Sequence, residues 1–168
     1  MLTGEFLTYA AFYVMAAIAL VGALLAVTRR NLLHAALGLI MSFFGVAGIY
    51  FVLEAEFVAI VQVLIYVGAI AVLILFVIML TRGLMQSTTR AENTQWLAAA
   101  FIAVLLFASL FIVVVGTNWR VAPAATVTDV IPKIGTELMT TYVLPFEIAS
   151  LLLLAALVGA IVVARESQ

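Results

Sequence analysis

Five long apolar runs dominate the chain and limit what it can fold into. A helix rises 1.5 Å per residue, so about 20 apolar residues cross the roughly 30 Å hydrocarbon core of a bilayer. Because lipid offers no partner to an unpaired backbone N–H or C=O, each run must be helical. The sequence predicts an all-α integral membrane protein, a single membrane domain over 1–168. Its five transmembrane helices are expected at 6–27, 32–53, 57–80, 96–115 and 146–164.

Composition excludes a soluble fold for most of the chain. Its 168 residues are 68% hydrophobic and 9% charged, whereas a soluble domain is about half apolar and a quarter charged. The net charge of −1 argues against nucleic-acid binding, which needs a basic face. The chain has no cysteine, which excludes disulfides, thiolate metal sites and a cysteine nucleophile.

The basic residues predict an orientation. Two of them, Arg120 and Lys133, fall on one side, in an expected outer loop over 116–144. The positive-inside rule places the side with more Lys and Arg in the cytoplasm. We therefore expect an external N-terminus, a cytoplasmic C-terminus and a bacterial plasma (inner) membrane location. The five basic residues on the cytoplasmic side are Arg29, Arg30, Arg82, Arg90 and Arg165.

The middle of every predicted span lacks Lys, Arg, Asp, Glu and His. Ionisable groups inside a membrane usually mark ion or proton paths. Their absence predicts that this chain alone is not the pump. His34 is the sole histidine, so the chain has no pair of histidine ligands for haem; it follows Asn31, which we expect to cap the helix over 32–53.

Small residues form stripes on two of the predicted helices. Gly38, Ser42 and Gly45 share one side of the second helix, and Ala155 and Gly159 are four residues apart on the last. Such stripes let helix backbones approach closely in membranes. Packing within the chain and packing on a partner both fit the pattern.

The third predicted helix carries the most specific pattern. Gln62 and Tyr66 lie one turn apart on one face, and Gly68 follows near mid-membrane. Glycine costs about 1 kcal/mol relative to alanine inside a helix, and π-bulges often occur at functional sites. Gly68 could therefore permit a local change of register, or it could admit a neighbouring helix.

Three segments carry a family resemblance. They are Tyr66-Val67-Gly68-Ala69-Ile70 in the third helix, Arg30-Asn-Leu-Leu-His-Ala-Ala36 before and inside the second, and Tyr142-Val-Leu-Pro-Phe-Glu-Ile-Ala-Ser150 before and inside the fifth. In this order and at these depths, they resemble chain J of NADH-quinone oxidoreductase (respiratory complex I). The mitochondrial counterpart of that chain is NADH dehydrogenase subunit 6.

The resemblance implies a non-catalytic membrane-arm subunit of a proton-translocating NADH:quinone oxidoreductase. It implies no cofactor in this chain, with FMN, iron–sulfur clusters and quinone held by partner subunits. The implied partners are other membrane subunits of the complex, namely the quinone-site subunit and small neighbouring subunits.

Site residues follow from the same resemblance. It implies a π-bulge whose α/π interconversion couples quinone reduction to proton movement, and that bulge would involve Tyr66, Val67, Gly68, Ala69 and Ile70. Gln62 and Glu147 become candidates for a polar axis or an interface. Some relatives carry glutamate at the position of Gln62, and glutamine cannot ionise. Glu147 is expected in the first turn of its helix, where the helix dipole favours an anion.

Three alternatives remain open. A homologous complex that receives electrons from ferredoxin or another donor would have the same pattern, because no feature of the sequence identifies the electron donor. A free-standing small transporter or channel is disfavoured by the uncharged spans and by the lack of an internal repeat. A purely structural scaffold differs from the coupling role only in whether the third helix moves.

Overall fold

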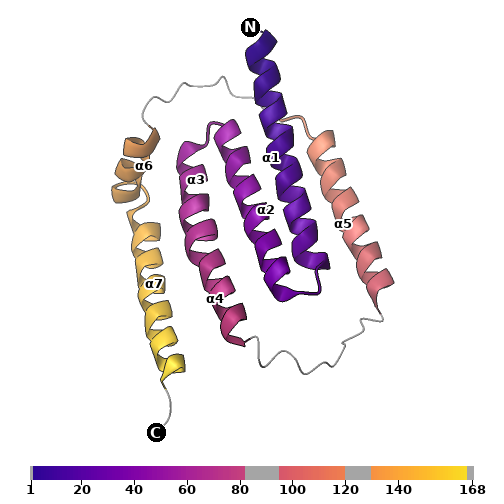
Figure 1. Cartoon of the computed structure of the whole chain (residues 1–168). Coiled ribbons are helices and arrows are strands. Elements are labelled where there is room, and N and C mark those ends of the chain that lie inside the picture. Colours follow the sequence, from indigo (N-terminus) through magenta and orange to yellow (C-terminus); the bar gives the residue numbers. More distant parts are fainter. Residues whose placement is uncertain (1, 82–94, 120–129, 166–168) are drawn as a thin grey trace. The chain divides into compact units, whose positions relative to one another are not determined.

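All elements in the described part of the chain are helices. The computed structural model describes residues 2–81, 95–119 and 130–165. In chain order (Figure 1) the elements are α1 (Leu2–Thr28), α2 (Leu32–Val52), α3 (Glu56–Val61), η1 (Gln62–Ile70), α4 (Ala71–Thr81), α5 (Trp96–Gly116), α6 (Val130–Met139) and α7 (Val143–Ala164). The helices α3, η1 and α4 follow one another without a break.

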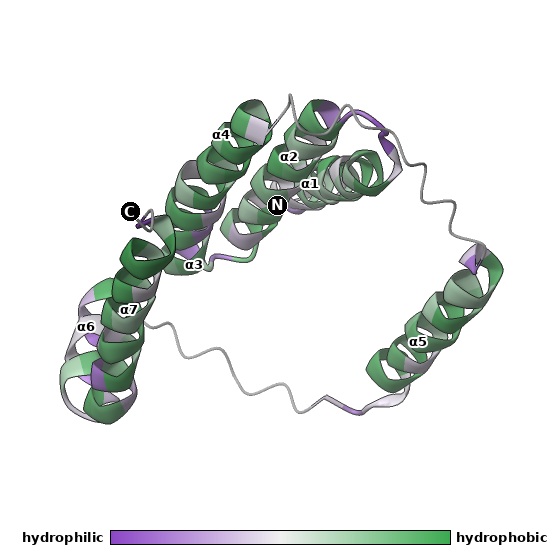
Figure 2. Cartoon of the chain, turned by 90° about the horizontal axis from the view of Figure 1, so that it is seen from below, coloured by the Kyte–Doolittle hydropathy of each residue, from purple (hydrophilic) through white to green (hydrophobic). Residues whose placement is uncertain are grey.

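Five helices within these ranges are long and apolar enough to cross a membrane, which confirms the five predicted spans. Hydrophobic residues make up most of their length (Figure 2). The orientation of the termini stays a prediction. The spans are Gly4–Thr28, Leu32–Val52, Glu56–Thr81, Trp96–Gly116 and Val143–Ala164.

The chain divides into two compact units, Met1–Pro123 and Ala124–Gln168. In the first unit, α1 and α2 form an antiparallel hairpin, and α2 also packs along α3, η1 and α4. The single membrane domain over 1–168 stays a prediction, because the structure describes each of the two units separately.

Small residues bring the backbones of α1 and α2 together. A Cβ atom added at Gly22 would lie 2.7 Å from the carbonyl oxygen of Gly38, and one at Gly45 would lie 2.5 Å from the backbone nitrogen of Ala19. Neither leaves room for a side chain. The small-residue stripe predicted on the second helix therefore packs within the chain, where close backbone approach supplies dispersion contacts.

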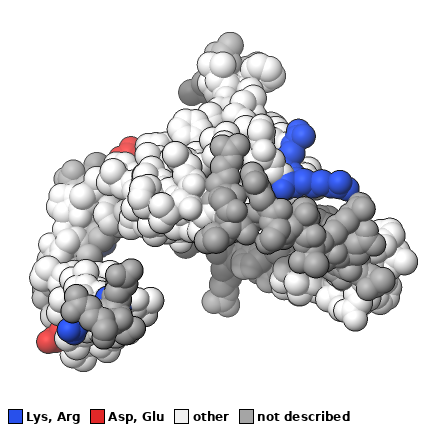
Figure 3. All heavy atoms as spheres, turned by 60° about the horizontal axis from the view of Figure 1, so that its bottom comes forward, with Lys and Arg blue, Asp and Glu red and all other residues white. Residues whose placement is uncertain are grey.

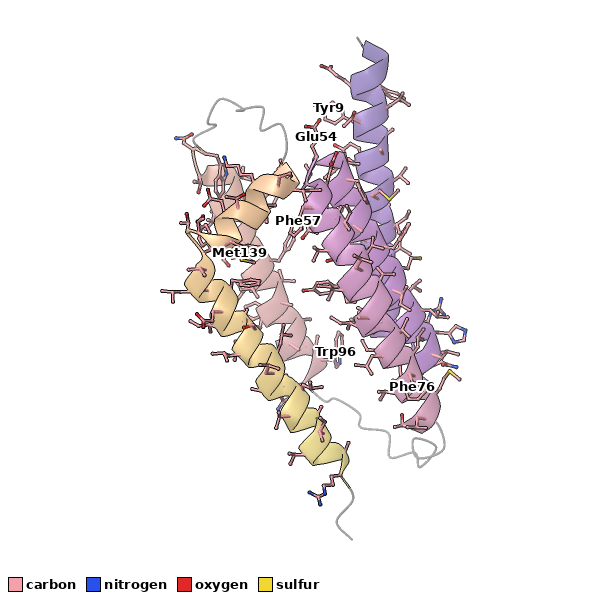
Figure 4. The ribbon with its side chains drawn as sticks, turned by 90° about the vertical axis from the view of Figure 1, so that its left-hand side faces the viewer. Tyr9, Glu54, Phe57, Phe76, Trp96 and Met139 are labelled. Atoms are coloured by element: carbon pink, nitrogen blue, oxygen red, sulfur yellow. The ribbon has the colours of Figure 1, made fainter. Side chains whose placement is uncertain are left out.

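The turn from α2 to α3 is a Schellman motif, the common hydrogen-bonded end of a helix. The Ala55 N–H donates to the Tyr50 carbonyl at 3.0 Å, and the Glu54 N–H donates to the Phe51 carbonyl at 3.1 Å. Glu54, labelled in Figure 4, has a φ of 59°. That left-handed position usually carries glycine.

The second unit corrects two expectations. The predicted outer loop over 116–144 contains a helix, α6, with apolar residues at 130, 134 and 138 on one face. The last span begins at Val143 rather than at residue 146. Pro145 lies in the first turn of α7, where a missing N–H costs nothing because first-turn N–H groups lack an intrahelical partner.

Two spans have no apolar core within the described residues. None of the membrane-crossing window of α5 or of α7 is buried, and no neighbouring atom lies within 4 Å of a Cβ added at Gly159. Within the described part of its own unit, the stripe of small residues on α7 therefore has no packing partner.

Candidate functional site

The third span is interrupted at mid-membrane by π-helix. Residues Gln62–Ile70 form η1, and the Ala71 N–H after it donates to the Tyr66 carbonyl, five residues back instead of four. The π segment predicted at Tyr66–Ile70 is confirmed, and it begins four residues earlier than expected. Glycine at position 68 lowers the preference for a regular α-helix.

The two polar side chains of this segment contact the same residue of α2. The side-chain amide of Gln62 donates to the Phe43 carbonyl over a long 3.5 Å, and Gln62 is 8% exposed. The Tyr66 ring meets the Phe43 ring edge-to-face, with centroids 5.4 Å apart. Gln62 and Tyr66 therefore share one face, as their spacing predicts.

Two buried alanines flank the π segment. Ala59 in α3 is 0% exposed and Ala71 in α4 is 1% exposed, and α2 is the helix that packs along both elements. In an unbroken α-helix, 12 residues would place them about 120° apart at 100° per residue. A π-bulge absorbs one residue and brings them to within about 20° of each other. The bulge therefore lets both alanines pack on the same face.

Within the described chain, no neighbouring helix lies against Gly68. A Cβ atom there would lie 3.4 Å from the Val63 carbonyl oxygen, and no other atom lies within 4 Å. Val63 is five residues earlier in the same π segment, and 3.4 Å is an ordinary van der Waals separation.

The remaining members of the predicted switch lie on the outside of the segment. Ala69 is exposed and Val67 is half-buried, while Ile70 is 36% exposed directly before the buried Ala71. Tyr66 is 43% exposed, although its ring edge contacts Phe43.

Glu147 does not lie in the first turn of its helix. Because α7 begins at Val143, Glu147 is the fifth residue, and the first turn contains no acid. The dipole argument for this carboxylate is therefore wrong. Glu147 is exposed, and its backbone carbonyl accepts a hydrogen bond from the Ser150 hydroxyl at 2.7 Å.

Sequence reasoning missed Ala59 and Ala71. The signal was present in their spacing, since two alanines 12 residues apart in an apolar span cannot share a face of one α-helix. Metal-ligating side chains form no group of three or more His, Cys, Asp or Glu within the described ranges.

Comparison with known proteins decides the family. The family described as NADH-ubiquinone/plastoquinone oxidoreductase chain 6 matches residues 22–163. The chain belongs to this family. The predicted resemblance to complex I is thereby confirmed, and all of η1 falls within the matched range of this chain 6 family.

Relatives of several kinds match most of the chain. NAD(P)H-quinone oxidoreductase chain 6 of Leptolyngbya boryana is 41% identical, over 92% of this chain and 78% of the relative. The F(420)H(2) dehydrogenase subunit J of Methanosarcina mazei is 37% identical, over 96% and 93%. NAD(P)H-quinone oxidoreductase chain 6 of Synechocystis is 38% identical, over 96% and 83%. The chain is thus similar to membrane subunits of quinone oxidoreductases.

Proposed function

We propose that this membrane subunit couples quinone reduction to proton translocation, with η1 as the coupling element. The observation that carries the proposal is the pair of buried alanines, Ala59 and Ala71, whose shared face depends on one residue held in the π-bulge. A contact that depends on a bulge is broken when the bulge is lost.

Loss of the bulge would turn α4 as a unit. In an all-α span, Ile70 takes the angular position of Ala71, and every later residue rotates by roughly 100° about the helix axis. Ala59, before η1, and Gln62, at its first position, would keep their places on α2. The larger Ile70 side chain would then meet the surface that now receives Ala71. Two packings of one helix can differ by only a few kcal/mol, so contacts with partners can select between them.

The names of the relatives support a division of labour in the complex. One relative is named for NAD(P)H and another for F(420)H(2), although both match this chain over nearly its whole length. Donor binding, FMN, iron–sulfur clusters and quinone would then belong to partner subunits. The uncharged middle of the spans would likewise leave the proton carriers in partners, while this chain contributes no redox centre.

The position in the membrane completes the proposal. The chain would be a multi-pass protein of the bacterial plasma (inner) membrane, with an external N-terminus. Its neighbours would be the quinone-site subunit and small membrane subunits of the complex. The uncovered apolar surfaces of α5 and α7 suit contacts with such chains and with lipid.

Deleting Ala69 tests the coupling role. The deletion shortens the separation of Ala59 and Ala71 from 12 to 11 positions, so an ordinary α-helix satisfies both contacts and no bulge remains to interconvert. We expect the assembled enzyme to keep electron transfer from its donor to a soluble acceptor. Quinone-linked donor oxidation and proton pumping should each fall roughly tenfold or more, because one of two functional states is removed.

A matched control keeps the composition and restores the spacing. Deleting Ala69 and inserting one alanine directly after Tyr66 restores the separation of 12 positions between the buried alanines, and it should recover both quinone-linked activities. Parental pumping by the deletion variant, measured in liposomes, would show that η1 is a static scaffold.

A further inference from the structure

The turn between α1 and α2 is a concentrated site of positive charge. α1 ends at Thr28 and α2 begins at Leu32, with Arg29, Arg30 and Asn31 between them. The Asn31 side chain accepts hydrogen bonds from the Leu33 N–H at 3.0 Å and from the His34 N–H at 3.4 Å, which confirms the predicted cap. Both arginines beside this cap are exposed.

Two adjoining pockets open at this turn. The first, of about 420 Å³, is lined by polar and basic residues, namely Thr28, Arg29, Arg30, Asn31 and His34. The second, of about 450 Å³, continues along the hairpin and is lined by Leu25, Arg29, His34, Leu37, Gly38 and Met41. Because both pockets share Arg29 and His34, they form one compound pocket with a basic mouth and an apolar floor.

The charges around the mouth favour an anion. The described acids of the first unit, Glu5, Glu54 and Glu56, lie at the opposite end of the α1–α2 hairpin from Arg29 and Arg30. The N-terminus of the 21-residue α2 adds the positive end of a helix dipole. Arg29 and Arg30 are the only Lys or Arg residues in the described part of the first unit, and Figure 3 draws Lys and Arg in blue.

We propose that this compound pocket binds one anionic phospholipid from the adjacent leaflet. The phosphate would lie between Arg29, Arg30 and His34, because guanidinium groups bind phosphate oxygens through paired N–H donors. One acyl chain would follow the floor past Leu37 and Met41, which extends about 10 Å along α2 from His34 at 1.5 Å per residue.

The apolar floor distinguishes a lipid from a free phosphate. A soluble anion would use the basic mouth alone, whereas a phospholipid also places an acyl chain beside Leu37, which is 51% exposed. A phospholipid satisfies both compartments at once, and basic pockets between membrane helices are known binding sites for anionic headgroups. The inference does not depend on η1 or on the proposed coupling role.

Photo-crosslinking in the assembled enzyme tests the site. The enzyme is placed in nanodiscs containing phosphatidylglycerol with a photoactivatable acyl chain, or the matching phosphatidylcholine, and adducts are mapped by peptide mass spectrometry. We expect phosphatidylglycerol adducts on residues 31–41 and roughly tenfold fewer from phosphatidylcholine. Replacing both arginines, Arg29→Gln with Arg30→Gln, should lower the adducts roughly 10- to 30-fold, the effect of losing two basic contacts with an anionic lipid.

Three matched variants keep the test decisive. Arg29→Lys with Arg30→Lys should retain most of the labelling, and Arg165→Gln, at the end of α7, should leave it unchanged. Leu37→Trp fills the apolar floor from an exposed position, and it should abolish labelling without disturbing the hairpin even if the glutamine variant does not assemble. Equal labelling by phosphatidylcholine, persistence in Leu37→Trp, or displacement by excess inorganic phosphate would each overturn the proposal.

Discussion

At the scale of single residues, Glu54 combines two local costs. Its φ of 59° places a side chain where L-residues other than glycine lose roughly 1–2 kcal/mol. Its carboxylate also follows the C-terminus of α2, whose partial negative charge disfavours an anion. The Schellman hydrogen bonds of Glu54 and Ala55 hold the residue there nevertheless.

Glycine at this position should therefore stabilise the chain. We expect Glu54→Gly to raise the unfolding free energy by about 1 kcal/mol, since glycine adopts positive φ without a steric cost. Glu54→Gln is the matched control: it removes the charge and keeps the side chain, so it should recover only the dipole part, about 0.3–1 kcal/mol. Thermal unfolding of the full chain in mild detergent, followed by circular dichroism, measures both. Equal stability of the two variants would mean that φ is not the cost.

At the scale of elements, the contact between α1 and α2 is set by which atoms meet each glycine. A Cβ atom at Gly45 would meet the backbone of Ala19, at 2.5 Å from its nitrogen and 2.8 Å from its Cα, whereas one at Gly48 would meet the flexible Met15 side chain. Backbone atoms cannot move without separating the helices, but a methionine can change rotamer. The two glycines are therefore unequal although they lie on the same helix.

This difference predicts a graded response to alanine. Gly45→Ala should lower the unfolding free energy by about 1–3 kcal/mol through overpacking, and Gly48→Ala should cost less than about 1 kcal/mol. Gly159→Ala, in a position without near neighbours in the described chain, should stabilise α7 by up to about 1 kcal/mol. Denaturation in mixed micelles gives the three values. The close approach would be disproved if the variants at 45 and 48 cost the same.

The π segment shows how one residue changes the relation between elements. In the third span, Phe57 near the start of α3 and Phe76 in α4 lie on one continuous helix (Figure 4). Because the span contacts α2 both before and after η1, any loss of the bulge must break one set of these contacts or the other. Ala59 and Ala71 are both fully buried. Without the bulge, only one of the two could therefore stay packed as it is now.

At the scale of the whole molecule, hydropathy was sufficient to predict the spans and insufficient to predict their ends. The apolar runs are long enough that lipid alone determines their structure. The start of α7 was misplaced because Pro145 looks like a helix boundary, although the first turn tolerates it. That error also put Glu147 in the wrong turn. α6 was missed because ten residues with one apolar face are a weak signal beside five spans.

The sequence predicts the residues of the candidate site on the third span but not their contacts with α2. Gly68 and the family resemblance indicated the π segment, and the spacing of Gln62 and Tyr66 predicted their shared face. The choice of Phe43 as their common partner depends on how α2 lies against η1, and no local pattern encodes that. The left-handed backbone conformation of Glu54 could not be predicted from the sequence either, because a glutamate rarely adopts positive φ.

The orientation of the whole chain yields the last prediction. Five basic residues against two favour a cytoplasmic C-terminus. A fluorescent protein fused after Gln168 should therefore be fluorescent, and alkaline phosphatase inserted after Asn118, at the exposed end of α5, should be active outside. Arg29→Gln with Arg30→Gln leaves three basic residues against two, so the same reporters should show a mixed population. Arg29→Lys with Arg30→Lys keeps the charge and should keep one orientation. Active phosphatase at the C-terminus would invert the assignment, and it would place the basic pocket at the α1–α2 turn in the outer leaflet.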